Sequence, residues 1–337
     1  MLMHACLQAT DDHVVVETTD TEVWMRTTIP AEVRQPGSVL LRESLLRPVA
    51  AVPGEIALAG DGQLVRGASK FRVPAMDIEG WPAQDDGAWK PLDVNATALA
   101  AAMASVSHAA TDDDMRKALN GIHLADGRVW GSDGVSLGFV RITSSGPSVT
   151  IPDRRARQVL AVLGEGARLE VANVREGIAG NLRITRGGEQ LSMRLLGAKP
   201  IAIQPVVDGF SHLDTPTAVK RSELLAAIKR FLPFANTIGP QPSKALPTIV
   251  LESSDGHMTM ADRLEESRES LDDAVVEHGP KFRAAVDPRR LIAALGAIDS
   301  GVVALHAPRD GAHAAFALWA HHADPRNEAH YVAPYTL

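Results

Sequence analysis

A clear fold signal in this 337-residue chain is the stretch Leu119-Asn120-Gly121-Ile122-His123-Leu124-Ala125-Asp126-Gly127-Arg128-Val129-Trp130. Within it, two short apolar runs flank an Asp126-Gly127 pair, the strongest short-range signal for a tight β-hairpin turn. On either side, Ala98–Val106 and Arg155–Leu163 place Leu, Val and Ala at spacings of three and four, as on the buried face of a helix. Single helices that flank a hairpin predict an α+β unit with antiparallel strands, not a parallel βαβ sheet.

The combination of a helix and a hairpin recurs along the rest of the chain. Three more segments have helical spacing of their apolar residues: Arg42–Val52, Ser222–Leu232 and Pro288–Ile298. The starts of the five helical segments are about 55 to 67 residues apart, long enough for a helix and several strands. Three more hairpins are predicted, in Glu55–Gly67, Arg168–Arg186 and Ile249–Met260.

Two helices in each repeat divide the chain into three predicted domains, at residues 1–88, 89–212 and 213–337. The borders, near Trp89-Lys90 and Asp208–Thr217, carry Pro, Gly and Asp, as linkers do. The first domain is incomplete, because it holds one helix without a second. Pro48 lies inside that helix and costs about 3 kcal/mol there, so Arg42–Arg47 is alternatively a separate turn.

The composition is that of a soluble globular protein with a large core, since 45% of the residues are hydrophobic. Neither a signal peptide nor a run of about 20 apolar residues occurs, and the single cysteine, Cys6, has no partner for an internal disulfide. We therefore expect a cytoplasmic protein. The net charge of −7 argues against a nucleic-acid-binding protein unless its basic residues gather locally. Aromatic residues, at 4%, are too few for binding single strands by base stacking.

Basic residues do gather, on or just before the predicted helices. Those that we predict to bind DNA are Arg42, Arg47, Arg154, Arg155, Arg157, Lys229, Arg230, Arg289 and Arg290. Acidic residues lie on the hairpins instead, as in Asp112–Asp114 and Asp262–Glu277. Arginine and lysine are also good helix formers on solvated faces, which is the simpler interpretation of any one of them. If the helices line one surface, that surface suits the phosphates of duplex DNA without reading its bases.

Four stretches of the chain resemble the bacterial DNA polymerase III beta subunit, the DNA sliding clamp. Leu119–Ile122, followed by Ser132-Asp133-Gly134 and Leu137, is similar to a Leu-Asn-Gly strand and a Thr-Asp-Gly segment of that family. The other three are Ile151–Arg154, Ser69–Val73 with Trp81-Pro82, and the terminal Tyr331–Leu337. Each motif is short, and their order, their spacing and the match at the last residue carry the resemblance. It covers the chain except for the front, where family members have a strand and a helix before the segment that matches Ala5–Thr10.

The resemblance implies a DNA clamp fold of class α+β, with three similar domains of antiparallel sheets and inward-facing helices. Two chains would join head to tail as a homodimer, and double-stranded DNA would pass through the ring without sequence preference. The protein would be a processivity factor and not an enzyme, with no catalytic residue, no cofactor and no metal. Its partners would be DNA, the polymerase and the clamp loader, with no membrane.

The resemblance also implies a groove that docks short peptides of the polymerase and the clamp loader. Carried over position by position, the groove comprises Leu119, Ser132, Gly134, Val135, Leu137, Ile201, Pro205, Val206, Ala333, Pro334, Tyr335 and Leu337. The family's His-Arg pair after Asp-Gly is Val135-Ser136 here, and its penultimate Arg is Thr336, so a different peptide preference is expected. The alternative is that these are ordinary core and rim residues.

Ring closure would join the first domain of one chain to the third domain of the other. The residues implied for this contact are Phe71, Val73, Leu232 and Phe234. Because the first domain is incomplete, an alternative is a clamp-like protein that does not encircle DNA and binds replication partners through the groove.

A remote alternative is a serine hydrolase, because Gly134–Gly138 matches the Gly-x-Ser-x-Gly pattern with Ser136 at its centre. That chemistry needs a helix after the serine, whereas Phe139–Ile142 is strand-like, so we interpret the match as chance. His321, His322, Asp324 and His330 are irregularly spaced for a metal site and are predicted to form a solvated turn.

Overall fold

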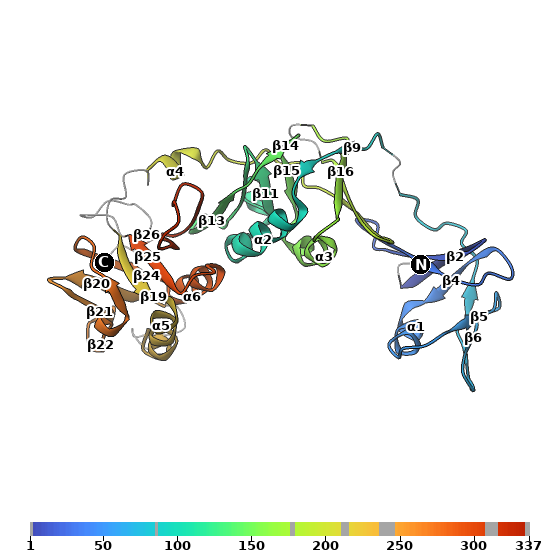
Figure 1. Ribbon diagram of the computed structural model, residues 1–337, viewed down its shortest axis with the longest axis horizontal. Helices are drawn as coiled ribbons and strands as arrows, with labels where there is room; N and C mark the ends of the chain where they lie inside the picture. Colours follow the sequence, from blue (N-terminus) through green and yellow to red (C-terminus); the bar gives the residue numbers. More distant parts are fainter. Residues whose placement is uncertain are drawn as a thin grey trace. The chain divides into compact units, whose positions relative to one another are not determined.

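The computed structural model describes residues 3–84, 87–175, 179–209, 216–235, 247–306 and 316–333 (Figure 1). The α-helices in these ranges are α1 (Glu43–Ala50), α2 (Ala96–Val106), α3 (Ala156–Val162), α4 (Gln204–Gly209), α5 (Arg221–Ala235) and α6 (Pro288–Ala297). Five of them confirm the five helical segments predicted from apolar spacing. The sixth, α4, has six residues, too few to show a helical period in the sequence. Every helix in the described ranges is too short or too polar to cross a lipid bilayer.

The first large sheet has nine antiparallel strands in the described ranges. Their order is β8 (Ala75–Met76), β4 (Gly37–Arg42), β1 (His4–Thr10), β2 (His13–Thr19), β3 (Val23–Pro30), β18 (Glu189–Arg194), β17 (Asn181–Arg186), β16 (Arg168–Ala172) and β9 (Lys90–Pro91). β3 and β18 pair from Val23 with Met193 to Thr27 with Glu189. This pairing makes one continuous sheet of strands from the predicted first and middle domains.

The second large sheet also has nine antiparallel strands among the residues that the structure describes. Their order is β15 (Val149–Ile151), β11 (Ile122–Ala125), β12 (Arg128–Ser132), β13 (Ser136–Arg141), β27 (Glu328–Val332), β26 (Phe316–Ala320), β25 (Val302–His306), β19 (Thr217–Lys220) and β23 (Val275–Glu277). β13 pairs with β27 from Ser136 with Val332 to Val140 with Glu328. A strand of the predicted middle domain is thereby joined to the last strand of the chain.

Smaller sheets complete the described fold. One has the order β22 (Arg268–Ser270), β21 (His257–Asp262), β20 (Ile249–Ser254) and β24 (Phe282–Val286), and another is β5 (Ala57–Leu58), β6 (Gln63–Arg66) and β7 (Ser69–Arg72). Two further short strands are β10 (Asp93–Val94) and β14 (Ser144–Ser145).

All four predicted hairpins are confirmed: β5–β6, β11–β12, β16–β17 and β20–β21. In the second and the fourth, both turn residues have positive φ, 51° and 68° at Asp126-Gly127 and 53° and 83° at Asp255-Gly256. Positive φ at both central residues is the requirement of a type I′ turn, which explains the Asp-Gly pairs in the sequence.

The C-terminal core lies around α5 and α6, which pack side by side (Figure 1). α5 buries Leu224, Ala227, Ile228, Phe231 and Ala235, and α6 buries Leu291, Ala294 and Leu295. These side chains form one cluster with apolar residues of β20, β21, β24 to β27. The spacing of three and four that marks the helices in the sequence is therefore the spacing of their buried side chains.

The helix α1 is short and has a smaller buried face. Val49 is its buried residue, and it packs with Leu41, Leu64 and Val73. The helix continues through Pro48 to Ala50, so the alternative of a separate turn at Arg42–Arg47 is wrong. A helix this short has few backbone hydrogen bonds for the proline to remove.

Two compact units divide the chain: Met1–Thr97 with Arg157–Gly197, and Ala98–Ala156 with Ala198–Leu337. They do not follow the predicted borders, because each large sheet joins strands of the predicted domain 89–212 to strands of one neighbour. Residues 210–215, around the second border, lie outside the described residues. The division into domains 1–88, 89–212 and 213–337 stays a prediction from the repeat.

Candidate functional site

The predicted DNA-binding residues lie on or beside α1, α3, α5 and α6. Seven of them are exposed to solvent: Arg42, Arg47, Arg154, Arg157, Lys229, Arg230 and Arg289. Arg154 and Arg155 belong to a single 3-10 turn, Asp153–Arg155, that leads into α3. Each of the four helices thus presents at least one cation at its surface or its start, as phosphate contacts require.

Arg47 and Arg230 are exposed cations that are paired with carboxylates. Arg47 Nε and Nη2 lie 2.7 and 2.6 Å from Glu43 Oε1, one helical turn earlier. Arg230 pairs with Glu269 of β22, and the hydrogen bond and charge of Glu269 raise the pKa of the guanidinium. Exposed pairs of this kind add little stability in water, and they reduce the positive charge available to a phosphate.

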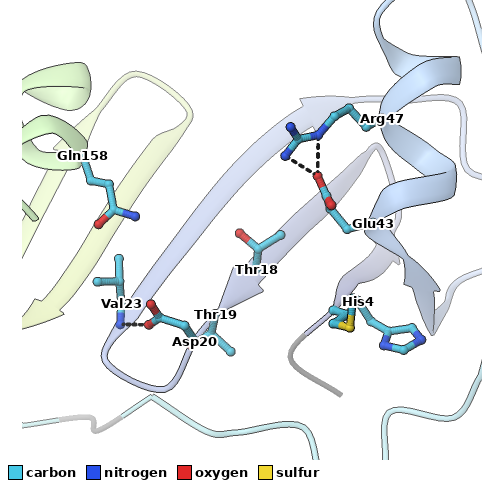
Figure 2. A pocket seen from close by; sticks show the side chains of 9 residues that line it. His4, Thr18, Thr19, Asp20, Val23, Glu43, Arg47 and Gln158 are labelled. Carbon is cyan, nitrogen blue, oxygen red and sulfur yellow. Dashed lines mark hydrogen bonds and ion pairs between the residues drawn. The ribbon is translucent and has the colours of Figure 1, made fainter. Parts of the chain in front are cut away.

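A hollow of about 300 Å³ lies beside Arg47 (Figure 2). It is lined by Met3, His4, Thr18, Thr19, Asp20, Val23, Glu43, Arg47 and Gln158. Arg47 reaches it from α1 and Gln158 from α3, with strands of the first sheet between them (Figure 2). The polar lining and the mixed charges of Glu43, Arg47 and Asp20 suit water or a hydrated ligand group better than an apolar one.

The predicted peptide groove centres on the turn between β12 and β13. Ser132 Oγ donates to Ser136 O at 2.7 Å and accepts from Gly134 N at 3.1 Å. Asp133 Oδ1 accepts from Val135 N at 2.9 Å and from Ser136 N at 2.6 Å. Gly134 has a φ of 84°, a conformation that side-chain-bearing residues rarely adopt. The Ser-Asp-Gly motif is therefore a turn whose own side chains satisfy its backbone.

Arg290 of α6 contacts this turn and not only solvent. Its guanidinium pairs with Asp133 and donates from Nη1 to Ser136 Oγ at 2.9 Å. Burial of Asp133 acts to raise the pKa of its carboxyl, but the hydrogen bonds from Ser136 N and Arg290 outweigh it and lower that pKa. The sequence pattern places Arg290 among the DNA-binding cations, whereas the structure shows its charge paired with Asp133.

The floor of the predicted groove is apolar. Leu137 belongs to a buried cluster with Trp130, Phe139 and Tyr331, and Leu119 packs against it. Ile203 and Val207 anchor α4 in the same cluster. Three other predicted groove residues stay exposed next to this anchor: Ile201 (46%), Val206 (41%) and Pro205. Exposed apolar side chains beside a buried apolar floor are typical of peptide grooves.

The end of the chain reaches the same place. Ala333 N donates to Val135 O at 2.7 Å, directly after the pairing of β27 with β13. Pro334, Tyr335 and Leu337, the last three predicted groove residues, lie outside the described residues. The structure thus brings Leu119, Gly134, Val135 and Ala333 together from three distant parts of the sequence.

One of the four predicted interface residues does not fit that role. Val73 is 1% exposed and packs in the core with Leu41 and Val49, so its side chain is not available to a second chain. The sequence gives no sign of this, because Val73 belongs to a short strand-like run with Phe71. Phe71 and Phe234 are exposed and Leu232 is half-buried, so these three remain predicted interface residues.

Ser136 is not placed as a catalytic nucleophile. It is 4% exposed, begins strand β13 and has Arg290 as the hydrogen-bond partner of its hydroxyl. An arginine stays protonated at all physiological pH values and cannot act as the base that a serine nucleophile needs. In the described ranges, no group of three or more His, Cys, Asp and Glu side chains is arranged to hold a metal ion.

Comparisons with known proteins agree with this geometry. A scan of protein-family models finds no match to the chain. Among solved structures, the beta subunit from DNA polymerase of Streptococcus pyogenes matches with a TM-score of 0.81 at 19% identity, over 100% of this chain and 92% of that one. A DNA polymerase sliding clamp from Pseudomonas aeruginosa matches over the same shares with a TM-score of 0.82 at 18% identity. A sliding clamp (DNA polymerase III subunit beta) from Bartonella birtlesii, bound to griselimycin, has a TM-score of 0.81 at 17% identity, again over 100% and 92%.

The chain therefore has the DNA sliding-clamp fold, of class α+β, along its whole length. The predicted fold class and the resemblance to clamp structures are both confirmed. Sequence reasoning missed two features of the site, the helix α4 and the contact of Arg290 with the β12–β13 turn. The turn residues were visible in the Ser-Asp-Gly motif, but no local signal pointed to a partner 157 positions away.

Proposed function

We propose that the protein is a DNA sliding clamp, which confers processivity by encircling duplex DNA and docking the polymerase and the clamp loader. The similarity to sliding clamps over all of this chain carries the proposal. The exposed cations on or beside α1, α3, α5 and α6 add a chemical reason, because four helices with basic residues suit a run of phosphates. In this function no covalent bond is made or broken, so the protein is not an enzyme.

The proposed assembly is a cytoplasmic homodimer of three domains per chain, at 1–88, 89–212 and 213–337. Phe71 of one chain would meet Leu232 and Phe234 of the other. Topology would hold the ring on DNA, so each phosphate contact can be weak and screened by salt. Weak contacts let the ring slide, because no single position along the duplex is preferred.

The most direct test is topological. The protein is loaded by the host's clamp loader onto a nicked circular plasmid, the complex is isolated by gel filtration, and the plasmid is then cut once. A clamp stays on the circle and slides off after the cut, whereas a protein bound only by charge remains on both forms. Equal retention before and after cutting would contradict the encircling function.

The DNA face can be tested by charge reversal. Arg154→Glu, Arg155→Glu and Arg157→Glu together are expected to weaken DNA retention and to lower the slope of log affinity against log salt by about 2 to 3, near one for each lost phosphate contact. The matched control reverses three exposed cations that lie outside the helices: Arg34, Arg263 and Lys281. Equal slopes for the two triple variants would place the DNA face elsewhere.

The groove can be tested by truncation. Deletion of Pro334–Leu337 is expected to reduce binding of a polymerase tail peptide below detection, because these residues complete the predicted groove. Fluorescence anisotropy of a labelled peptide measures the affinity, and the circular dichroism spectrum reports whether the fold persists. An unchanged dissociation constant would place the peptide site elsewhere.

A second candidate is a clamp-like protein that binds replication partners through the groove without encircling DNA. The pairing of Arg47, Arg230 and Arg290 with carboxylates favours it, because it reduces the positive charge on three of the four helices. Light scattering distinguishes the two candidates. A stable monomer at micromolar concentration together with normal peptide binding would support this second function.

A further inference from the structure

The β12–β13 turn is held from two sides by arginines that are distant from it in sequence. On one side, Arg116 Nη1 donates to Asp133 O at 2.5 Å, and its Nε donates to Asp113 Oδ2 at 2.8 Å. On the other side, Arg290 pairs with the Asp133 carboxylate. Asp133 thus has one guanidinium on its backbone carbonyl and another on its side chain.

The Arg290–Asp133 contact is less exposed than the Arg47–Glu43 pair of α1. The side chain of Arg290 is 30% exposed and that of Asp133 is 21% exposed, whereas the Arg47 side chain in the Arg47–Glu43 pair is 79% exposed. Arg290 also has Ser136 Oγ as a second acceptor at 2.9 Å. A charge-assisted pair with a second hydrogen bond, partly shielded from water, fixes geometry more strongly than a solvated pair.

The first turn of α6, which carries Arg290, is also held in place. Asp287 caps the start of α6, since its Oδ1 accepts from Arg289 N at 2.8 Å, and its Oδ2 lies 3.9 Å from Arg290 Nε. Arg290 therefore leaves α6 between two carboxylates, Asp287 and Asp133. To bind a DNA phosphate, the Arg290 guanidinium would have to move away from both carboxylates.

What Arg290 holds in place is the wall of the predicted groove. The Asp133 carboxylate that it binds accepts the backbone N–H groups of Val135 and Ser136. Val135 O in turn accepts from Ala333 N, the last described residue before the C-terminal groove residues. A loss of Arg290 would leave the half-buried Asp133 carboxylate without its cation, and the turn would gain freedom to move.

We infer that Arg290 is a positioning residue of the peptide groove, which locks the β12–β13 turn to α6, and that it is not a DNA contact. The inference rests on the proposed function, because it assigns Arg290 to the peptide site and removes it from the DNA face. It predicts that peptide affinity and DNA affinity respond to different arginines at neighbouring positions of α6.

The test compares Arg290→Gln with Arg289→Gln in the full-length protein. The probe is a fluorescently labelled synthetic peptide with the sequence of the C-terminal tail of the host's replicative polymerase. Arg290→Gln is expected to weaken peptide binding at least fivefold and to leave the salt slope of DNA binding unchanged. Arg289→Gln is expected to lower the salt slope by about one. Lys281→Gln, which removes an exposed pair with Asp255, is the control expected to change neither.

Three further variants separate positioning from general loss of structure. Arg290→Lys keeps the positive charge, so its peptide affinity is expected to be higher than that of Arg290→Gln. The affinity stays below that of the wild type, because lysine lacks the planar guanidinium. Ser136→Ala removes one acceptor and keeps the Asp133 pair, with an expected weakening of about twofold. Asp133→Asn is expected to weaken peptide binding as Arg290→Gln does, and the double variant is expected to be no weaker than either single one, because both remove the same contact.

The outcomes are distinct. Wild-type peptide affinity in Arg290→Gln, or a salt slope lowered as in Arg289→Gln, overturns the inference and leaves the proposed function intact. A wild-type protein that neither binds the peptide nor stays on circular DNA overturns both. If Arg290→Gln does not fold, Arg290→Lys and Ser136→Ala decide, and full affinity in both overturns the inference.

Discussion

The helices α5 and α6 and the helix α1 show two ways to cover a sheet. α5 and α6 pack on each other and bury apolar side chains along their full lengths, from Leu224 to Ala235 and from Leu291 to Leu295. α1 buries Val49 and contains a proline. Burial of apolar area supplies most of the stability of a helix in a protein. The α5–α6 region is therefore expected to be more stable than the α1 region, and substitution of its buried residues is expected to cost more free energy of unfolding.

The largest expected effect is in the C-terminal core. Phe231→Ala removes a buried ring that packs among α5, α6 and the neighbouring strands, and it is expected to destabilise the protein by about 3 to 5 kcal/mol. Val49→Ala in α1 is expected to cost about 1 to 2 kcal/mol, because a smaller cavity is left. Urea unfolding monitored by tryptophan fluorescence measures both. Equal losses would mean that α1 contributes as much as the paired helices.

Acid is expected to destabilise the unit that holds α5 and α6. Burial lowers the pKa of His123 to about 4, against 6.5 for an exposed histidine, and His123 stacks on Trp130 at 3.8 Å. Below pH 6.5 the unfolded chain binds a proton that the folded chain rejects, so stability falls as the pH falls from 6.5 to about 4. The loss is about 3 kcal/mol for this histidine over that window. Burial and the nearby His330 also lower the pKa of His108 to about 4, so the two residues act in the same direction.

His123→Gln is expected to flatten this pH dependence, and unfolding curves at pH 7, 6, 5 and 4 measure it. The control is His278→Gln, at an exposed position, which is expected to leave the dependence as it is. A wild-type slope in His123→Gln would show that other groups control the acid sensitivity.

A smaller effect is expected from replacing the proline inside α1. Pro48→Ala restores a backbone N–H inside the helix and is expected to stabilise the protein by about 1 kcal/mol. The gain is smaller than the usual cost of an interior proline, because proline also restricts the unfolded chain. Thermal unfolding measures the change. A loss of stability would mean that the ring of Pro48 packs against a neighbour and supports the helix.

The turn at Ser132–Ser136 has both local and distant hydrogen-bond partners, and only the local ones can be predicted from the sequence. Its Asp133 and Ser132 side chains satisfy backbone groups two to four positions away, so a local motif predicts the turn. The partner Arg290 is 157 positions away, and its own neighbourhood predicts only an exposed cation on a helix. Val73 is a second example. A short strand predicts that side chains alternate between two faces, but it does not show which face packs against α1.

The helices, the hairpins and the α+β class can be predicted from the amino-acid sequence, because the spacing of apolar residues and the positive φ of Asp-Gly turns act over a few residues. Its motifs also indicated the clamp fold. The three-dimensional fold was needed to show which cations have carboxylate partners, which predicted interface residue is buried, and how strands of the middle region belong to two different large sheets. Those features depend on contacts between residues far apart along the chain, and a local sequence pattern does not predict which of these residues will be in contact.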